Sequence, residues 1–378
     1  MKSVDKSGIH IVSFDVPFPT DYGGVIDVYH RCKSLKEIGV YVILHCFEYG
    51  RGEQDELLKV ANEVHYYSRE KTLAAFLSKK PFIVASRSAP ELLENLVKDN
   101  YPILFEGIHT CFFLDHPSLK NRWKGVRAHN IEHYYYEELA KIEPKFFRKQ
   151  FFKVEAKKLE KYEAIFTFAD EILTVTPKDT IYFKKKYRKG VYIPVFNPLS
   201  WGESKKGTGN YALFHGNLSV IENEYAFRFL ANEVWKKEFK LNLIVAGKDP
   251  SPKFLNYLNS LPFKVECIAN PNNEKLNKLI REAKINLLPT FQNTGIKHKL
   301  LNCLSNGGFS IANTPMVEGT GLEKMCFVAN TTEEWKKLIQ QLTERENDQS
   351  FFTARQEELQ HIFDCTANAH KIMALIEK

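Results

Sequence analysis

The stretch Thr294–Leu322, TGIKHKLLNCLSNGGFSIANTPMVEGTGL, contains a turn, a helix and a strand in that order. Gly295 permits a tight turn, and leucines at positions 300, 301 and 304 then recur on one face of a helix. A pair of glycines beginning at Gly307 ends that helix, and Phe309–Ala312 is apolar enough for a buried strand. A helix followed directly by a buried strand is typical of an α/β fold with a parallel sheet.

The start of this helix carries two lysines, Lys297 and Lys299. The N–H groups of a first helical turn lack partners within the helix, and the aligned peptide dipoles add partial positive charge there. The stretch therefore predicts a site for an anionic ligand. An ordinary turn with two solvated lysines fits the same pattern, since surface lysines near helix ends are common.

The same stretch resembles the donor-site segment of nucleotide-sugar-dependent glycosyltransferases of the GT-B fold, in particular the retaining family 4. Members often read G-x-G-(I/L)-K-x-K-(L/V)-(L/I)-E-A-x-A-x-G-x-P-(V/I)-V, followed by E-G-(L/I). The matching positions are Gly295, Ile296, Lys297, Lys299, Gly307, Glu318 and Gly319. The family's glutamate, which accepts hydrogen bonds from the nucleotide ribose, falls at Asn302, and its partner falls at Thr294. An amide can still bond to ribose hydroxyls but brings no charge.

Strand and helix patterns alternate along most of the chain. Ile9–Phe14, Val25–Ile38 and Val40–Cys46 predict a strand, a helix and a strand, and a second series begins at Tyr211. Residues 196–210, FNPLSWGESKKGTGN, are rich in Gly, Ser, Asn and Pro and indicate a connector between the two series. A length of 378 residues also exceeds a typical single core. The sequence therefore predicts an α/β chain of two domains, each with a doubly wound parallel sheet.

The resemblance adds the roles of these domains. It implies the GT-B arrangement, in which two Rossmann-like domains face each other across a cleft. Residues 1–196 would form the acceptor domain, and residues 197–350 would form the nucleotide-sugar-binding domain. The resemblance also implies that a C-terminal helix within residues 351–378 packs back on the N-terminal domain.

A pair of glycines, Gly23 and Gly24, precedes the first predicted helix. Ligands of open α/β sheets bind beyond the carboxyl ends of the strands, where glycines let backbone N–H groups approach a phosphate or sugar. A glycine pair is also common in plain turns. Because the pair resembles the family's N-terminal glycine loop, which lies against donor phosphates and acceptor, we expect it at the nucleotide sugar. Tyr22 and Asp27 are further candidates, with Asp27 on the acceptor side.

The segment Val126–Glu132, VRAHNIE, follows a predicted strand and clusters four polar residues. It resembles the R-x-H-N-x-E signature of many family 4 enzymes. We expect both His129 and Arg127 to be catalytic: the imidazole beside the leaving group would hydrogen-bond a sugar hydroxyl, and the guanidinium would hold a phosphate or orient a carboxylate. The structural alternative is that Arg127 pairs internally with Glu132 and that His129 is a buried, satisfied ring.

Glu106 and His109 lie after another predicted strand, in the sequence EGIH. We expect both on the acceptor side, where a general base for the acceptor hydroxyl could come from this pair. A hydrogen-bonded structural pair fits the sequence equally well, and a retaining mechanism can proceed without such a base.

The second domain opens with a strand pattern that ends at Gly216 and Asn217. Family members commonly carry Arg or Lys at the position of Asn217 and a lysine at the position of Asn223, both against the diphosphate. Two neutral amides replace those charges in this chain. The phosphate charges are therefore expected to come from elsewhere in the second domain.

Three lysines are the candidates for those charges. Lys297 and Lys299 lie at the helix start, and Lys248 follows the predicted strand Leu241–Ala246. The full set of residues expected at the nucleotide sugar is Gly23, Gly24, Gly216, Asn217, Lys248, Gly295, Lys297, Lys299 and Asn302.

Two basic stretches stand out against a modest net charge of +7. Lysines and arginines interleave with phenylalanine and tyrosine in Lys141–Lys161 and in Thr180–Gly190. Such surfaces attract anionic lipid headgroups, a phosphorylated acceptor or nucleic acid. The alternative is that the lysines form a solvated rim around aromatic residues that face a core. In the first stretch these are Phe146, Phe147, Phe151 and Phe152.

Signals for metal binding and export are absent from the sequence. The seven cysteines have no metal-ligand spacing, no D-x-D motif occurs, and no apolar run approaches the ~20 residues of a membrane span. We therefore expect a cytoplasmic protein without a metal, and with no cofactor other than a nucleoside diphosphate sugar as donor substrate. A peripheral contact with the inner face of an anionic membrane stays open.

Together these features favour a glycosyltransferase that moves a sugar from a nucleoside diphosphate onto a saccharide or lipid-linked saccharide. We expect it to be retaining and metal-independent and to act in cell-surface polysaccharide or glycan biosynthesis. Its partners would be the nucleotide sugar and the acceptor, and nucleic acid is not expected. A catalytically inactive GT-B-like binding protein would explain the amides at Asn217, Asn223 and Asn302. A sugar-nucleotide epimerase would share the fold but would need no acceptor.

Overall fold

The computed structural model describes residues 7–199, 206–292 and 295–377. The chain divides into two compact units, residues 1–198 with 363–378, and residues 199–362. The first division lies between Pro198 and Leu199, close to the boundary expected after residue 196. The C-terminal segment 351–378 is divided: it belongs to the second unit as far as Ile362 and to the first unit from Phe363 onward.

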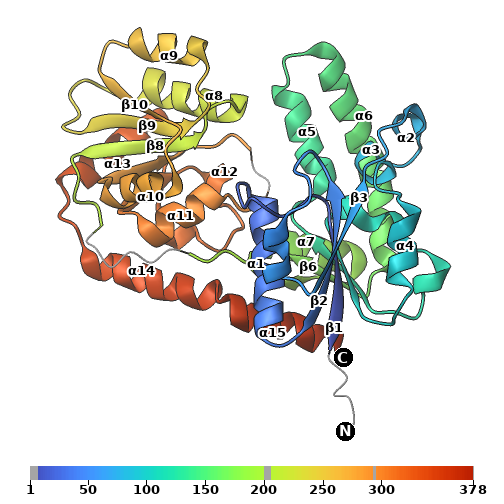
Figure 1. Ribbon diagram of the computed structural model, residues 1–378. Coiled ribbons are helices and arrows are strands. Elements are labelled where there is room, and N and C mark those ends of the chain that lie inside the picture. Colours follow the sequence, from blue (N-terminus) through green and yellow to red (C-terminus); the bar gives the residue numbers. More distant parts are fainter. Residues whose placement is uncertain (1–6, 200–205, 293–294, 378) are drawn as a thin grey trace. The chain divides into compact units, whose positions relative to one another are not determined.

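A seven-stranded parallel sheet forms the centre of the first unit (Figure 1). Its strand order is β3-β2-β1-β4-β5-β6-β7. The strands are β1 (Gly8–Ser13), β2 (Tyr41–Glu48), β3 (Glu63–Ser68), β4 (Ile103–Glu106), β5 (Lys124–Ala128), β6 (Glu171–Thr174) and β7 (Val191–Tyr192). Because β1 pairs with β2 on one side and β4 on the other, the strand order reverses here. The carboxyl ends at such a switch point are the usual ligand-binding edge of an open α/β sheet.

Helices pack on both faces of this sheet. They are α1 (Gly23–Glu37), α2 (Leu73–Leu77), α3 (Phe82–Ala85), α4 (Pro90–Leu96), α5 (Glu132–Ile142), α6 (Phe146–Tyr162), α7 (Pro177–Tyr187) and α15 (Cys365–Ile376), with the short turns η1 (Asp55–Lys59), η2 (Ile108–Phe113), η3 (Pro117–Leu119) and η4 (Glu163–Phe168). One apolar cluster joins α1 and α15 to β1 and β2. A second cluster joins α4, α7 and η4 to β4 and β5. Because alternate strand residues point to opposite faces, each face buries its own set of apolar side chains.

A six-stranded parallel sheet forms the centre of the second unit, in the order β10-β9-β8-β11-β12-β13. Its strands are β8 (Tyr211–Asn217), β9 (Asn242–Lys248), β10 (Val265–Ala269), β11 (Ile285–Leu288), β12 (Phe309–Ala312) and β13 (Phe327–Val328). The helices are α8 (Ile221–Phe229), α9 (Pro252–Asn259), α10 (Asn273–Glu282), α11 (His298–Asn306), α12 (Thr314–Val317), α13 (Thr332–Glu344) and α14 (Gln349–Ile362), with the turns η5 (Leu230–Val234) and η6 (Glu323–Met325). The order reverses between β8 and β11, which repeats the topology of the first unit. The prediction of two doubly wound parallel-sheet domains is confirmed.

The stretch that begins at Thr294 has the structure that its sequence predicts. Gly295 has a φ of 60°, a left-handed conformation that a glycine adopts without strain. Helix α11 follows and ends at Gly307, and the next element is β12, whose four residues are all buried. Thr294 itself lies outside the described residues.

The two basic stretches differ in structure. In the first, Phe146 and Phe147 at the start of α6 are 66% and 88% exposed, so the alternative that they face a core is wrong for these two residues. In the second, Phe183 of α7 is fully buried and Lys186 pairs with Glu163 at 2.6 Å, so this stretch is largely a helix packed on its own unit. Among the helices of the described residues, none is both long and apolar enough to cross a membrane.

Candidate functional site

The carboxyl edge of the first sheet begins with the turn from β1 into α1. The helix starts at Gly23, as the glycine pair predicts. A Cβ atom on Gly24 would lie 2.5 Å from the ring of Phe14, so the helix approaches that ring more closely than a larger residue would allow. The hydroxyl of Tyr22 donates to Asp15 at 2.8 Å, which fixes the loop in front of the helix.

Behind this turn lies a buried network of two carboxylates and two guanidiniums. Asp27 on α1 accepts from Arg31 one turn later, 2.7 Å from Nη1, and from the Nε and Nη2 atoms of Arg127 on β5, each at 3.1 Å. Arg31 also pairs with Glu106 at the end of β4. All four side chains are fully shielded from solvent. The charges therefore balance within the network, as buried charges must.

The ion pairs of this network keep the Asp27 carboxylate ionised. Burial raises the pKa of Asp27, but the neighbouring Arg127 and Arg31 lower it by more, so this carboxyl stays ionised well below its usual range. Arg127 also donates to the backbone carbonyls of Ile193 and Pro194 at 2.6 and 3.0 Å. The polar side chains thus lock α1, β5 and the segment after β7 to one another.

His129 lies where this network reaches the surface. Its Nε2 atom is 3.0 Å from Oε2 of Glu106, and its Nδ1 atom is 3.9 Å from Oδ2 of Asp27. The ring is 15% exposed, whereas the carboxylates behind it are not exposed at all. The imidazole is therefore oriented by Glu106 and presents an edge to solvent, a geometry that suits a group contacting substrate.

Three other residues predicted at this site have different surroundings from those expected. Arg127 makes an internal pair, but its partner is Asp27 rather than Glu132, and it is too buried to touch a ligand. Asp27 and Glu106, expected on the acceptor side, are buried as well and act on their neighbours. Their common feature is full burial, which sequence spacing does not reveal.

The expected pair of Glu106 and His109 does not form. Glu106 bonds to His129 instead, and the Nδ1 atom of His109 is buried without a hydrogen-bond partner. Burial, followed by the nearby Arg87, holds the pKa of His109 well below its ordinary value. The ring of Phe14 contacts both imidazoles, with its centroid 5.5 Å from that of His109 and 5.6 Å from that of His129. Both histidines thus line the same edge of the sheet.

The pKa of the Glu132 carboxyl is shifted in a way that the sequence does not indicate. It lies in the first turn of α5, is 7% exposed, and accepts from Asn130 at 3.4 Å. Burial is the main cause that raises its pKa to about 7, and Asp179 raises it further. The sequence identified Glu132 only as an alternative partner of Arg127, because its burial depends on tertiary packing.

Asp27, Glu106 and His129 are the group of potential metal ligands that the described residues bring together, with ligand atoms within 4.8 Å of one another. Both carboxylates, however, are already neutralised by Arg31 and Arg127. A metal ion would have to compete with two buried guanidiniums for the same oxygens. The donor set therefore suits an internal salt-bridge network better than a metal site.

In the second unit, the ends of β8 and β9 lie side by side. Asn217 is paired in register with Lys248, which is exposed at the end of its strand. A Cβ atom on Gly247 would lie 1.8 Å from the carbonyl oxygen of Gly216, so the backbones approach closely here. Asn223 donates to the carbonyl of Asn217 at 3.0 Å and so closes the loop between β8 and α8.

Lys299 in the first turn of α11 reaches this loop. Its Nζ atom donates to Oδ1 of Asn223 at 3.2 Å and lies 5.7 Å from the centroid of Phe214. Burial lowers the pKa of Lys299, while nearby Glu222 opposes the shift. The cation from α11 thus contacts one of the two positions where charges are missing. Lys297 directly precedes α11, and Asn302 lies in its second turn with a partly exposed side chain.

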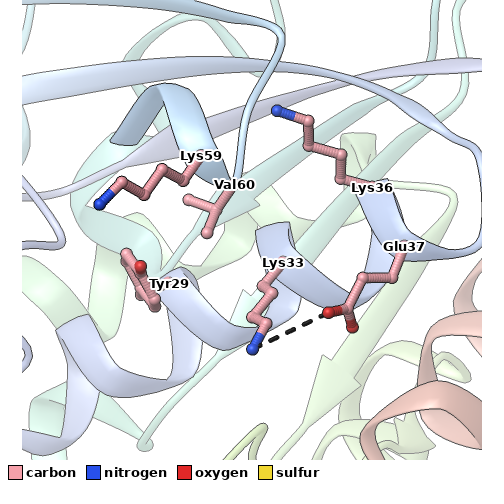
Figure 2. Close-up of a pocket in the computed structure, with 6 residues that line it drawn as sticks. All are labelled: Tyr29, Lys33, Lys36, Glu37, Lys59 and Val60. Atoms are coloured by element: carbon pink, nitrogen blue, oxygen red, sulfur yellow. Dashed lines mark ion pairs between the residues drawn. The ribbon is translucent and has the colours of Figure 1, made fainter. Parts of the chain in front are cut away.

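A surface hollow in the first unit lies away from these residues. It encloses about 410 Å³ between α1 and the η1 turn, lined by Tyr29, Lys33, Lys36, Glu37, Lys59 and Val60 (Figure 2). Figure 2 shows Lys33 directed at Glu37, 3.8 Å away. Lys59 pairs with Glu56 at 2.7 Å, and Lys36 donates to the carbonyls of Leu58 and Ala61. Since its lysines have partners and it contains no residue predicted for the site, we do not assign this hollow to the activity.

Comparison with known proteins agrees with this architecture. No model of a protein family matches the chain. A Klebsiella pneumoniae protein described as an uncharacterized 44.6 kDa protein in the cps region is 26% identical over 334 residues, which cover 83% of this chain and 84% of that relative. Similar solved structures include TarM, with a TM-score of 0.70 and 11% identity over 100% of both chains. The glycotransferase of kitacinnamycin has a TM-score of 0.62 and 12% identity over 98% of this chain and 99% of its own. Together with the sheet topology, these likenesses identify the fold as GT-B.

Proposed function

We propose that the protein is a retaining, metal-independent glycosyltransferase that moves a sugar from a nucleoside diphosphate onto a saccharide or lipid-linked saccharide. The observation that carries the proposal is the contact of Lys299 with Asn223, which brings a cation from α11 to the loop after β8 within a GT-B fold. Two similar structures, a mutant of S. aureus TarM and LpCGTa, were solved in complex with UDP, and this supports a nucleoside diphosphate as the ligand. The retaining outcome rests on the resemblance to family 4.

In this proposal, the second unit holds the nucleotide. Lys299, Lys297 and the N-terminus of α11 would neutralise the charge that grows on the leaving diphosphate as the glycosidic bond breaks. A half-buried ammonium interacts with a phosphate more strongly than a solvated one does, because less water screens it. Asn302 would bond to the ribose hydroxyls, and the glycines at Gly216 and Gly295 would allow the backbone to approach the ligand.

In the first unit, His129 would contact the transferred sugar. Glu106 fixes its ring through Nε2, and the exposed edge of the ring would meet a ligand hydroxyl. Asp27, Arg31 and Arg127 would position these two residues without touching substrate. We propose the acceptor on the same edge, beside His109.

The donor assignment can be tested with a panel of UDP, GDP, ADP and dTDP sugars in a thermal-shift assay, followed by measurement of donor turnover. At least one donor should raise the melting temperature, and Lys297→Ala or Lys299→Met should reduce that shift. Lys278→Ala is the matched control, because Lys278 is an exposed lysine of the same unit that pairs with Glu282. If no donor shifts the melting temperature, or if both site variants respond like the wild type, the assignment of this site is wrong.

A catalytically inactive binding protein is the second candidate, favoured by the neutral residues Asn217, Asn223 and Asn302. It predicts donor binding without turnover. Turnover in the presence of a mixed saccharide and lipid-linked acceptor extract would exclude it. Epimerised donor that appears without any acceptor would instead assign an epimerase.

We further propose that the protein acts at the inner face of a membrane, in cell-surface polysaccharide biosynthesis, for which the cps region in the relative's description is the support. The contact would be the α2/α6 surface, which consists of the exposed residues Leu73, Phe76, Leu77, Phe146 and Phe147 with the neighbouring Lys145 and Arg148. Phe76 stacks on Phe151 of α6 at 5.8 Å, so the two helices form one surface. Exposed aromatic rings beside cations are typical of a contact with anionic headgroups.

Vesicle co-sedimentation tests this contact. Binding to vesicles with anionic phosphatidylglycerol should exceed binding to pure phosphatidylcholine, and Phe147→Ser should weaken it several-fold. Phe168→Ser changes an exposed phenylalanine outside this surface and should have no effect. Equal binding to both vesicle types, or an unchanged Phe147→Ser variant, would contradict the proposal.

A further inference from the structure

Two arginines of the first unit lie close together without a carboxylate. Arg69 directly follows β3, and Arg87 lies two residues after α3. The Nη2 atom of Arg69 donates to Oγ of Ser86 at 2.8 Å, and the backbone N–H of Glu70 donates to the carbonyl of Ser86 at 2.9 Å. These contacts tie the two segments together, and the guanidiniums lie near enough for the charge of Arg69 to lower the pKa of Arg87.

Neither guanidinium is neutralised by the described part of the protein. Within 4.0 Å of either one there is no carboxylate oxygen of a described residue. Among the described residues, Arg87 donates only to backbone carbonyls, from Nε and Nη2 to Phe14 at 3.1 and 2.8 Å and from Nη1 to Ile83 at 2.6 Å. The Nε atom of Arg69 is buried and has no hydrogen-bond partner among the described residues.

The burial of Arg87 makes this lack of a counter-charge costly. The residue is 5% exposed, and burial, with a further contribution from Arg69, lowers its pKa to about 9. Asp15 is near enough to oppose the shift slightly, but its carboxylate pairs with Arg51 at 3.3 Å. The fully buried Arg31 and Arg127, in contrast, each have a carboxylate partner. A buried cation without a counter-charge is strongly disfavoured, and an anionic ligand would relieve that cost.

The pair lies at the edge of the sheet that the proposed acceptor would use. Arg87 holds the carbonyl of Phe14, the residue after β1, and the ring of Phe14 contacts both His109 and His129. The Nδ1 atom of His109 is buried and unpartnered there. Arg69 is partly exposed, and the exposed ring of Tyr49 lies 4.6 Å from its guanidinium carbon.

We propose that Arg69 and Arg87 bind an oxyanion, a phosphate or a carboxylate, that the acceptor carries. The proposal rests on the proposed function in that it takes the first unit as the acceptor unit. Two guanidiniums match the planar or tetrahedral arrangement of such oxygens and bind them by charge-assisted hydrogen bonds. The acceptor would thus be a uronic acid or a phosphorylated saccharide or lipid rather than a neutral sugar.

Calorimetric titration at low ionic strength with two matched ligand pairs tests this. Methyl β-glucuronide is compared with methyl β-glucoside, and glycerol 1-phosphate with glycerol. The wild type should bind at least one anion about tenfold or more tightly than its neutral partner, and Arg69→Gln should lose about tenfold in affinity. The ligand pair with the larger difference in affinity shows whether the site prefers a carboxylate or a phosphate.

Several variants keep the test decisive. Arg188→Gln removes an exposed arginine of the same unit, outside the proposed binding surfaces, and should bind like the wild type. Arg69→Gln is the primary variant, since Arg87→Gln also removes bonds that hold Phe14 in place. Equal affinity for charged and neutral ligands, absence of saturable anion binding, or an unaffected Arg69→Gln variant would overturn the proposal.

The failure of this inference can be told apart from failure of the proposed function. Lys299→Met changes only the second unit, so glucuronide or phosphate binding should persist in it. If Lys299→Met loses anion binding while Arg69→Gln keeps it, the anion binds in the second unit and the inference is overturned. Absence of any donor binding in the thermal-shift panel, with the anion still bound through Arg69, would instead contradict the proposed function.

Discussion

The charged side chains at the carboxyl edges of the two sheets have different kinds of partner. In the first unit, Asp27, Glu106, Arg31 and Arg127 cancel one another in a fully buried network. In the second unit, the half-buried Lys299 donates to the neutral side chain of Asn223. A charge matched inside the protein fixes geometry and needs no ligand, whereas a charge left with neutral partners favours an anion from outside. We therefore expect the first group to position its neighbours and Lys299 to bind an anionic ligand.

Removing one member of the matched network should have the largest effect. Arg127→Met leaves Asp27 buried with one guanidinium instead of two, and we expect a loss of about 3–5 kcal/mol in the free energy of unfolding. Urea denaturation followed by circular dichroism measures it. Since Asp27 is the group that bears this cost, Asp27→Leu combined with Arg127→Met should recover part of the loss.

A control separates the network from the general loss of an arginine. Arg148→Met removes an exposed side chain of the same unit and should change the free energy of unfolding by less than about 0.5 kcal/mol. If Arg127→Met is no more destabilising than Arg148→Met, the network does not stabilise the first unit as described.

Glu132 gives a second test in the same unit, because it is a buried carboxyl that forms no ion pair with any described residue. Its pKa is about 7 in the folded protein and near 4.5 when unfolded. Between these values the folded state keeps a proton that the unfolded state has lost, so this group stabilises the fold at pH 4.5 and ceases to do so as the pH rises through 7. At pH 8, Glu132→Gln should therefore be more stable than the wild type by about 3 kcal/mol at most, and the difference should vanish near pH 4.5.

Denaturant unfolding at pH 5 and pH 8 measures this dependence. Glu138→Gln is a suitable control, since Glu138 lies on the same helix but pairs with Lys141 near the surface. A Glu132→Gln variant whose stability relative to wild type is the same at both pH values would mean that the carboxyl is not held in its protonated form.

The sequence predicts local structure well where the signals are local. Helix α11 and strand β12 follow from leucine spacing, a left-handed Gly295 and the glycine pair at Gly307, all within a few residues of one another. Strand β3 (EVHYYS) was missed, because it lies at the edge of the sheet and mixes polar with aromatic residues instead of forming an apolar run. Arg69 directly follows this missed strand.

The pairings at the site could not be predicted in the same way. Arg127 and Asp27 are 100 residues apart and meet because β1, β4 and β5 lie side by side in the sheet. The sequence placed both residues near the correct edge but offered Glu132 as the partner of Arg127. Which carboxylate is buried beside which guanidinium depends on strand order and helix packing, and no short-range pattern encodes either.

The smallest expected effect concerns Lys299, the cation whose hydrogen-bond partner, Asn223, is neutral. Lys299→Met should lower the affinity for a nucleoside diphosphate about 10- to 100-fold, the loss expected for a charge-assisted hydrogen bond. The same change should not destabilise the second unit, because burial already lowers the pKa of Lys299 and methionine fills a similar volume. Calorimetric titration with UDP and GDP gives the affinity, and thermal unfolding without ligand gives the stability. Lys278→Met serves as the exposed control. A variant that loses stability but keeps nucleotide affinity would make Lys299 a structural residue like Arg127, and the contrast between the two edges would no longer hold.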